Sequence, residues 1–300
     1  MGTFTSGFWT LWITALTLGG MAFCLLLLLA LSRRGPGKPV DPATITGHVW
    51  DGDLAELNNP LPRWWLSLFC ISIVFGLGYL ALFPGLGDWE GLLHWTSAGQ
   101  YQSEQGAAEL ALKPELDRYA AMNLVQVAGD PVAHGMGQRL FLNHCAPCHG
   151  SDGGGQRGFP NLRDQDWLYG GDPATIEQTI LQGRQGQMPA WGAVLGKDGV
   201  QQVVHYVLSL SGSRHDPALA ALGQPRFAAI CAGCHGPDGK GNVAVGAPNL
   251  TDHIWLYGGT EADLIETVTN GRHGQMPAQQ GRLGPARVHL LAAYVYGLSR

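Results

Sequence analysis

Two stretches of this sequence decide its fold: GMGQRLFLNHCAPCHG at residues 135–150 and ALGQPRFAAICAGCHG at residues 221–236. The second repeats the first at an offset of 86 residues, with Gly, Gln, Phe and a Cys-x-x-Cys-His motif at matching places. Asp130-Pro131 also returns as Asp216-Pro217, which predicts a helix N-cap followed by a first helical residue in each copy. The chain therefore contains two tandem copies of one small domain.

Beyond the motifs the offset becomes 88 residues: PNL, WLYGG and GRQGQMPA each return, the last as GRHGQMPA. The two extra residues fall in the Gly-rich stretch after each motif, where a loop tolerates insertion. We expect mainly helical copies, with helices over residues 173–182, 199–210, 261–270 and 285–298. Each copy has about 80 residues, a size at which a domain usually needs a staple, and a covalently bound apolar cofactor would be one.

The motifs Cys145-Ala146-Pro147-Cys148-His149 and Cys231-Ala232-Gly233-Cys234-His235 are typical of c-type haem attachment. Two thiols three residues apart reach the two vinyl groups at one porphyrin edge, and the following histidine then faces the iron. A zinc site would need four ligands, but each copy has a single Cys-x-x-Cys. A redox dithiol would not need the histidine. We therefore predict two covalently bound haem c groups.

The second axial ligand of each iron is predicted to be a methionine. Met188 and Met276 lie in identical QMPA contexts about 40 residues after the histidines. A thioether opposite histidine raises the reduction potential and is typical of electron transfer. The sequence leaves open whether each methionine serves the haem of its own copy or of the other. With both positions of each iron filled, chemistry on a small substrate is disfavoured.

Other repeated residues are candidates for supporting roles. A carbonyl near Pro160 or Pro248 is a candidate acceptor for the second ring N–H of each ligand histidine. The remaining pairs are candidates for contacts with the haem or its propionates: Trp167 and Trp255, and Arg184 and Arg272. Among the histidines without a counterpart in the other copy, we interpret four as surface or packing residues: His144, His205, His253 and His273.

Two uncharged apolar runs near the N-terminus are long enough to cross a membrane. Residues 8–31 would form a helix of about 36 Å, against a bilayer core of about 30 Å, and residues 64–83 form the second run. Arg33, Arg34, Lys38 and Arg63 lie in the loop between them, which predicts a cytoplasmic loop and both chain ends on the other side. Cys24 and Cys70 lie inside these runs and are interpreted as structural.

The charge pattern argues against nucleic-acid binding. The formal net charge is −5, without clustered Lys and Arg. Residues 85–300 carry 14 Lys and Arg against 19 Asp and Glu. We therefore expect a basic donor protein to dock with a salt-sensitive rate.

The two copies resemble class I cytochrome c domains. In addition, TGHVWDGDLAELNNPLPRWW at residues 46–65 resembles the segment before the main span of the CcoP/FixP family, the di-haem subunit of cbb3-type haem-copper oxidases. The resemblance implies axial ligands at His149, Met188, His235 and Met276. It also implies a non-catalytic subunit that passes electrons from periplasmic cytochrome c toward an oxygen-reducing catalytic subunit. The implied partners are that catalytic haem-copper subunit, a mono-haem cytochrome c subunit and membrane lipid.

The predicted organisation is mainly α, with two transmembrane helices followed by two tandem class I cytochrome c domains in a bacterial inner membrane. The predicted ranges are a first transmembrane helix at 1–35, a cytoplasmic loop at 36–63, a second transmembrane helix at 64–84, a periplasmic tether at 85–129 and cytochrome domains at 130–213 and 214–300. Three rivals remain at this point. They are a di-haem subunit of a dehydrogenase or cytochrome bc-type complex, a di-haem enzyme and a redox or gas sensor.

Overall fold

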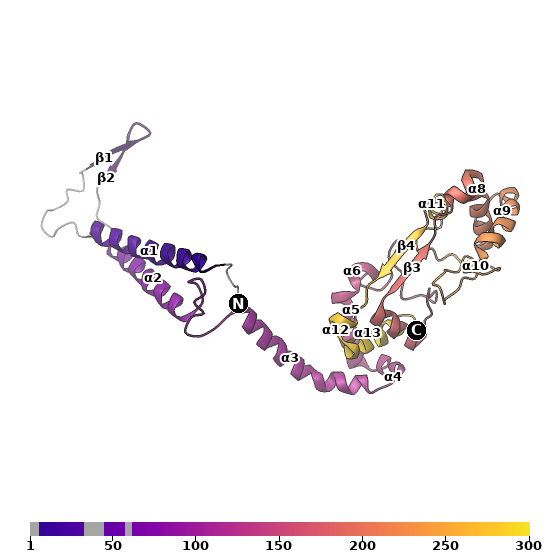
Figure 1. Ribbon diagram of the computed structural model, residues 1–300, viewed down its shortest axis with the longest axis horizontal. Helices are drawn as coiled ribbons and strands as arrows, with labels where there is room; N and C mark the ends of the chain where they lie inside the picture. Colours follow the sequence, from indigo (N-terminus) through magenta and orange to yellow (C-terminus); the bar gives the residue numbers. More distant parts are fainter. Residues whose placement is uncertain (1–5, 33–44, 58–61) are drawn as a thin grey trace. The chain divides into compact units, whose positions relative to one another are not determined.

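The computed structural model describes residues 6–32, 45–57 and 62–300 (Figure 1). The chain divides into two compact units, residues 1–110 and 111–300, and each is described by itself. The first unit holds the two long apolar helices, and the second holds both copies of the repeat. The predicted mainly helical class with two N-terminal apolar helices is confirmed.

Helices α1 (Gly7–Ser32) and α2 (Arg63–Leu82) are both long and apolar enough to cross a membrane. They contact one another in the first unit, where a Cβ on Gly76 would lie 3.1 Å from the Met21 methyl carbon. The hydroxyl of Thr10 donates to Asp88 Oδ2 at 2.6 Å, which ties the start of α1 to the segment after α2. Small residues and hydroxyl groups thus hold the helix pair together.

The described part of the predicted cytoplasmic loop contains a β-hairpin that the sequence analysis did not anticipate. Strands β1 (Ile45–Trp50) and β2 (Leu54–Leu57) are antiparallel. Asp51 and Gly52 at the turn both adopt positive φ, as tight hairpin turns require. The rest of that predicted loop lies mostly outside the described residues.

The predicted tether is also largely helical. It contains α3 (Ser97–Ala120) and α4 (Leu124–Ala128). In the second unit, Tyr119 at the end of α3 is fully buried, and its hydroxyl donates to Asp130 Oδ1 at 3.1 Å. This end of the segment is therefore part of a packed core.

The two copies of the repeat have matching elements. The first contains α5 (Pro131–His144), α6 (Ala146–His149), α7 (Pro173–Gln182), β3 (Arg184–Met188) and α8 (Gly192–Leu210). The second contains α9 (Pro217–Ile230), α10 (Ala232–His235), α11 (Glu261–Asn270), β4 (Arg272–Met276), α12 (Gln280–Leu283) and α13 (Pro285–Leu298). Asp130 and Asp216 cap α5 and α9 through their carboxylates, as predicted. Helix α8 begins earlier than predicted and is interrupted by a non-helical residue, Gly196.

The two copies exchange their last helices. Helix α13 of the second copy packs on α5 and α7 of the first, and α8 of the first copy packs on α9 and α11 of the second (Figure 1). Two apolar cores result, each built from both copies. The predicted boundary between residues 213 and 214 separates the repeats along the sequence, but the cores do not follow it.

A glycine permits each helix crossing. A Cβ on Gly137 of α5 would lie 2.6 Å from Tyr294 Cβ on α13, and a Cβ on Gly223 of α9 would lie 2.0 Å from the Gln202 carbonyl oxygen on α8. Neither helix pair has room for a side chain at this point. Tyr294 and Tyr206 then pack on Phe141 and Phe227, with ring centroids 5.4 and 5.2 Å apart.

A two-stranded ribbon marks the place where the copies cross. Strands β3 and β4 are antiparallel, and Gly186 pairs with Gly274 at the centre. Arg184 pairs with Met276 at one end, and Met188 pairs with Arg272 at the other. The antiparallel register therefore places the two methionines at opposite ends of the ribbon.

Candidate functional site

Each Cys-x-x-Cys-His motif forms a short helix directly after the capped helix that opens its repeat. Cys145 ends α5 and precedes α6, and its backbone N–H donates to Phe141 O at 2.8 Å. Cys231 has the same place between α9 and α10 and donates to Phe227 O at 2.8 Å. A single turn thus presents both thiols and the histidine of each motif.

The ring of each motif histidine is held by the backbone carbonyl that the sequence analysis proposed. His149 Nδ1 lies 3.0 Å from Pro160 O, and His235 Nδ1 lies 3.1 Å from Pro248 O. A carbonyl oxygen only accepts, so Nδ1 must carry the proton and donate it. This tautomer leaves Nε2 of each ring with a lone pair for a metal ion.

Each methionine packs against the core that contains the haem motif of the other repeat. Met276 packs against the first core together with Cys145 and Trp167. Met188 packs against the second core together with Cys231 and Trp255. Between the two alternatives that the sequence left open, this arrangement favours exchange of the methionines.

The thiols do not resemble reactive or zinc-binding cysteines. Burial, with the neighbouring Cys148, raises the pKa of the Cys145 thiol to about 11, and burial beside Cys234 raises that of Cys231. Reactive and zinc-binding cysteines are instead thiolates with lowered pKa values. Within the described ranges, no group of three His, Cys, Asp or Glu side chains is placed to hold a metal ion. Free thiols beside a histidine held by a carbonyl, together with a half-buried methionine, fit a covalently attached haem c.

The repeated arginines lie at the ribbon ends. Arg184 and Arg272 each stack over a tyrosine ring, Tyr169 and Tyr257, at 4.7 Å from the centroid. Each Nε donates to a threonine hydroxyl at 2.9 Å. The buried Nη2 of Arg272 has no hydrogen bond in the part of the chain that the structure describes. A buried unsatisfied donor fits an acidic group such as a haem propionate.

Of the four histidines interpreted as surface or packing residues, two are exposed and two are not. His253 and His273 are exposed, whereas His205 is buried, accepts from Asp216 N at 3.0 Å and lies 3.5 Å from Glu261. His144 is half-buried. Another histidine, His289 on α13, was missed. It bridges the Glu177 carboxylate and the Met122 carbonyl at 2.9 and 3.1 Å, and no local pattern marked it because these partners are 112 and 167 residues away in sequence.

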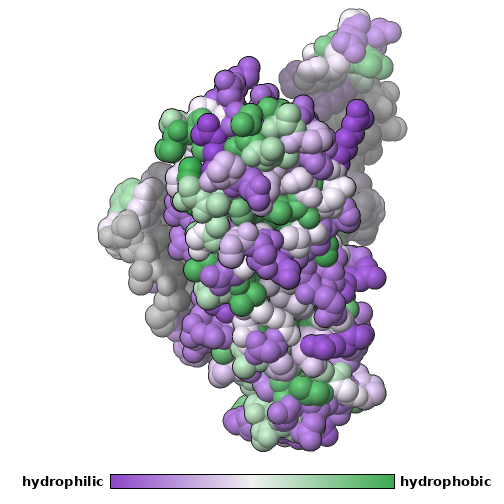
Figure 2. Space-filling view, turned by 90° about the vertical axis from the view of Figure 1, so that its right-hand side faces the viewer, coloured by the Kyte–Doolittle hydropathy of each residue, from purple (hydrophilic) through white to green (hydrophobic). Residues whose placement is uncertain are grey.

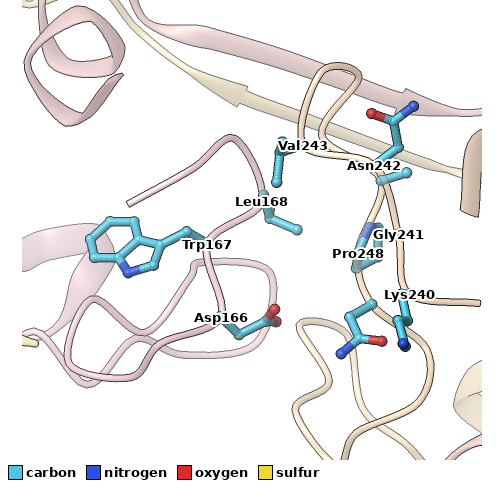
Figure 3. A pocket seen from close by; sticks show the side chains of 10 residues that line it. Asp166, Trp167, Leu168, Lys240, Gly241, Asn242, Val243 and Pro248 are labelled. Atoms are coloured by element: carbon cyan, nitrogen blue, oxygen red, sulfur yellow. The ribbon is translucent and has the colours of Figure 1, made fainter. Parts of the chain in front are cut away.

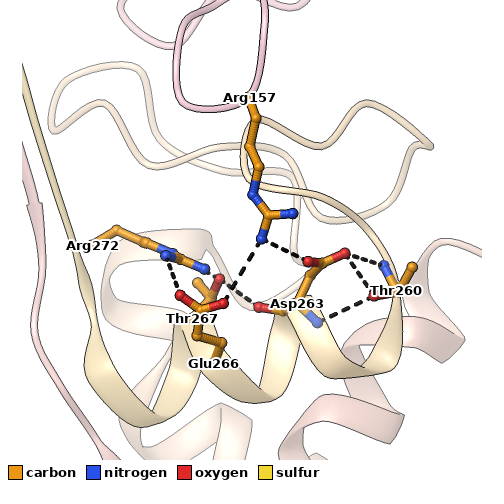
Figure 4. Close-up of polar contacts among 6 residues, drawn as sticks. All are labelled: Arg157, Thr260, Asp263, Glu266, Thr267 and Arg272. Atoms are coloured by element: carbon orange, nitrogen blue, oxygen red, sulfur yellow. Dashed lines mark hydrogen bonds and ion pairs between the residues drawn. The ribbon is translucent and has the colours of Figure 1, made fainter.

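The loop after the first motif contacts the second repeat. Gly158 N donates to Leu256 O at 2.7 Å, and the Arg157 guanidinium lies 2.7 Å from Asp263 Oδ1 on α11 (Figure 4). Asp263 and Thr260 form a capping box at the start of α11. These contacts thus join the loop after the first motif to the N-terminal part of α11 in the second repeat.

A cavity of about 330 Å³ lies between the repeats. Figure 3 shows Asp166, Trp167 and Leu168 of the first repeat on one side and the Gly-rich loop with Lys240 and Asn242 of the second on the other. Pro248, whose carbonyl holds His235, also lines it. On the outer surface, hydrophobic groups are scattered among hydrophilic ones on the face that Figure 2 displays.

The fold and the paired motifs define a tandem class I cytochrome c preceded by two apolar helices. The family model for the cbb3-type cytochrome c oxidase subunit III matches residues 133–207 and 218–295. The model for the N-terminal domain of the cbb3 cytochrome oxidase FixP matches residues 43–90. The chain belongs to the CcoP/FixP family of cbb3-type cytochrome c oxidase subunits, so the suspected resemblance is confirmed.

Curated relatives are similar over almost their whole length. The CcoP subunit of Rubrivivax gelatinosus is 47% identical, covering 100% of this chain and 98% of the relative. The FixP subunit of Azorhizobium caulinodans is 41% identical, covering 90% and 99%. The CcoP subunit of Cereibacter sphaeroides is 42% identical, covering 87% and 96%. Membership implies haem c and an electron-transfer role in the oxidase.

Proposed function

We propose that this chain is the membrane-anchored di-haem c subunit of a cbb3-type oxidase and passes electrons from a periplasmic cytochrome c toward the oxygen-reducing catalytic subunit. The observation that carries the proposal is the repeated combination of two thiols, a histidine ring held by a carbonyl and a half-buried methionine. The chain supplies two such sets, so we propose two covalently bound haems. In this proposal the chain is a non-catalytic electron-transfer subunit of an oxidoreductase complex.

We propose exchanged axial ligands. The first site consists of Cys145, Cys148, His149 and Met276. The second site consists of Cys231, Cys234, His235 and Met188. The packing of each methionine beside the other repeat's cysteine supports this pairing. Each of the ranges 130–213 and 214–300 then provides the cysteines and the histidine of one site and the methionine of the other site.

Bound haem supplies a one-electron couple, and the chain's own residues prepare it. The carbonyls of Pro160 and Pro248 accept from Nδ1 of the two histidine rings, which leaves each Nε2 free to bind the iron of a haem. Arg272 has a buried donor available for a propionate. Met188 and Met276 pack against the apolar cores, and a thioether ligand opposite histidine would favour the reduced state.

We propose that α1 and α2 span the inner membrane, with residues 36–63 cytoplasmic and the N-terminus and both haem domains periplasmic. The Lys and Arg residues in or just before that segment support this orientation: Arg33, Arg34, Lys38 and Arg63. The proposed partners are the catalytic haem-copper subunit, the mono-haem cytochrome c subunit, the donor cytochrome c and membrane lipid. The acidic balance of residues 85–300 suits a basic donor, so we expect oxygen uptake to slow as salt rises.

Isolation in mild detergent tests the proposed function. The chain should co-purify with b-type haem and copper, and should keep two haems on a haem-stained denaturing gel. Cys148→Ser and Cys234→Ser should each weaken the stain, and their combination should weaken it further. Cys70→Ser in α2 is the matched control and should leave haem content unchanged. Isolation with a dehydrogenase, or a haem content that Cys234→Ser does not lower, would contradict the proposal.

A further inference from the structure

The two sites differ in chemistry at three equivalent positions. At the offset of 86 residues, His144 corresponds to Ile230, because both directly precede the first cysteine of a motif. After the motifs, Gln279 corresponds to Trp191, and Arg282 to Val194. The backbone repeats accordingly: Gln279 N donates to Ile180 O at 3.0 Å, and Trp191 N donates to Val268 O at 3.0 Å.

The first site is polar on this side. His144 Nδ1 and Gln279 Oε1 are both buried, and neither has a hydrogen bond within residues 6–32, 45–57 and 62–300. His144 directly precedes Cys145, and Gln279, three residues after Met276, is the N-cap residue of α12. Burial, assisted by the positive charge of Arg282 on α12, lowers the pKa of His144. His144 and Arg282 therefore interact next to the cysteine of the first site, and Gln279 lies close in sequence to its methionine.

The second site is apolar at the same positions. Trp191 packs against the second core together with Met188 and Cys231. Ile230 is half-buried, and Val194 is 68% exposed. The two sites therefore have the same proposed ligands, a histidine and a methionine, but polar neighbours in the first site and apolar neighbours in the second.

This difference has a predictable electrostatic consequence. A ferric haem carries one more positive charge than a ferrous haem, so nearby acceptor atoms and polarity stabilise the ferric state. A neutral His144 ring has one acceptor nitrogen, and Gln279 Oε1 is a second acceptor. Arg282 acts in the opposite direction, but it is exposed and solvent screens its charge.

We propose that the haem of the first site, held by Cys145, Cys148, His149 and Met276, has the lower reduction potential, and that His144 and Gln279 lower it. The inference rests on the proposed function, because it assumes two haems with exchanged methionines. A single electron shared between the two haems then resides mainly at the second site. His144 and Gln279 act on the potential from beside the site and do not bind the iron.

Potentiometric titration of the α-band in the full-length chain, isolated in its complex, tests the inference. Two variants exchange residues between the repeats: His144→Ile in the first site and Ile230→His in the second. A third variant, Gln279→Leu, replaces the amide of the first site by an apolar side chain. His144→Ile and Gln279→Leu should each raise the lower-potential component, with at least about a threefold change in its reduction equilibrium, or ~28 mV at 59 mV per tenfold. Ile230→His should lower the higher-potential component.

Two results would overturn the inference. In one, His144→Ile and Gln279→Leu both leave the lower component unchanged. In the other, they move the higher component. If His144→Ile impairs folding next to the attachment motif, the potential measured for Gln279→Leu alone decides the test. Haem content measured on the same samples separates the two proposals: two haems with unmoved potentials overturn this inference alone, whereas fewer than two haems in the parent chain overturn both.

Discussion

The Arg157 guanidinium lies 2.7 Å from the Asp263 carboxylate, and this ion pair joins the loop after the first haem motif to α11 of the second repeat (Figure 4). Asp263 has a second role, because its other oxygen accepts from the Thr260 hydroxyl at 2.6 Å. The Thr260 hydroxyl and Arg157 together lower the pKa of Asp263. The contact therefore links the docking of two repeats to the start of one helix.

We expect Arg157→Ala to destabilise the protein only slightly, because the Arg157 side chain is 60% exposed and solvent screens the pair. The midpoint of thermal unfolding should fall by less than about 4 °C at low salt, and the effect should shrink at high salt. The folded pKa of Asp263 is lowered, so its contribution is present above the unfolded pKa and disappears as pH falls through the folded one. Lys197→Ala, at an exposed lysine, is the matched control and should have no effect. An effect that grows with salt would contradict this account.

Gly223→Ala should be far more damaging than a typical helix substitution. The added Cβ would lie 2.0 Å from the Gln202 carbonyl oxygen, which is backbone and has no rotamer to change. Overpacking of this kind costs about 1–3 kcal/mol. The control is Gly297→Ala on α13, where a Cβ meets no atom within 4 Å and should be neutral or stabilising by about 0.5–1 kcal/mol. The measurement is the midpoint of thermal unfolding of both variants. Equal midpoints would show that α8 and α9 do not cross as described.

Asp166 should make stability decrease as pH rises. Burial, then the charges of Asp252 and Asp164, raises the pKa of Asp166 to about 6. Its folded pKa lies above the unfolded value of about 3.9, so the folded state binds the proton more tightly. The resulting stabilisation is complete below about pH 4 and is lost between about pH 4 and 6.

Asp166→Asn should therefore stabilise the protein at pH 7, where the wild type holds a half-buried charge beside two others. We expect about 1 kcal/mol, because partial exposure screens the charge. Asp198→Asn, at an exposed carboxylate of α8, is the control. The measurement is the unfolding midpoint of each variant from pH 4 to 8. A gain from Asp166→Asn that is the same at pH 4 and pH 8 would count against the titration of this group.

Local signals in the sequence predicted much of the fold. Asp130 and Asp216, each followed by proline, gave the correct helix starts, and the apolar pattern gave α13 its correct bounds. The carbonyls of Pro160 and Pro248 were also anticipated, because the repeat placed the same loop after each histidine. These features depend on neighbours in sequence or on the repeat itself.

The exchange of helices between the copies was not predictable in the same way. Either copy of a repeat presents an equivalent apolar face, so the sequence of α13 suits the core of its own copy and that of the other copy equally well. The strand pairing of Gly186 with Gly274 is likewise a contact between copies, and Gly-rich strands give weak local signals. From the sequence alone, each methionine could serve the haem of its own copy or that of the other copy. The choice between these two alternatives depends on the packing of Met188 and Met276.

The central claim is that each haem takes its methionine from the other repeat. The direct measurement uses full-length chains with Cys231→Ala and Cys234→Ala, which retain only the haem bound to His149. In this background, Met276→Leu should abolish the charge-transfer band of histidine–methionine ligation and lower the potential of the remaining haem, whereas Met188→Leu should leave both unchanged. The opposite pattern, with Met188→Leu removing the band and Met276→Leu preserving it, would contradict the exchange.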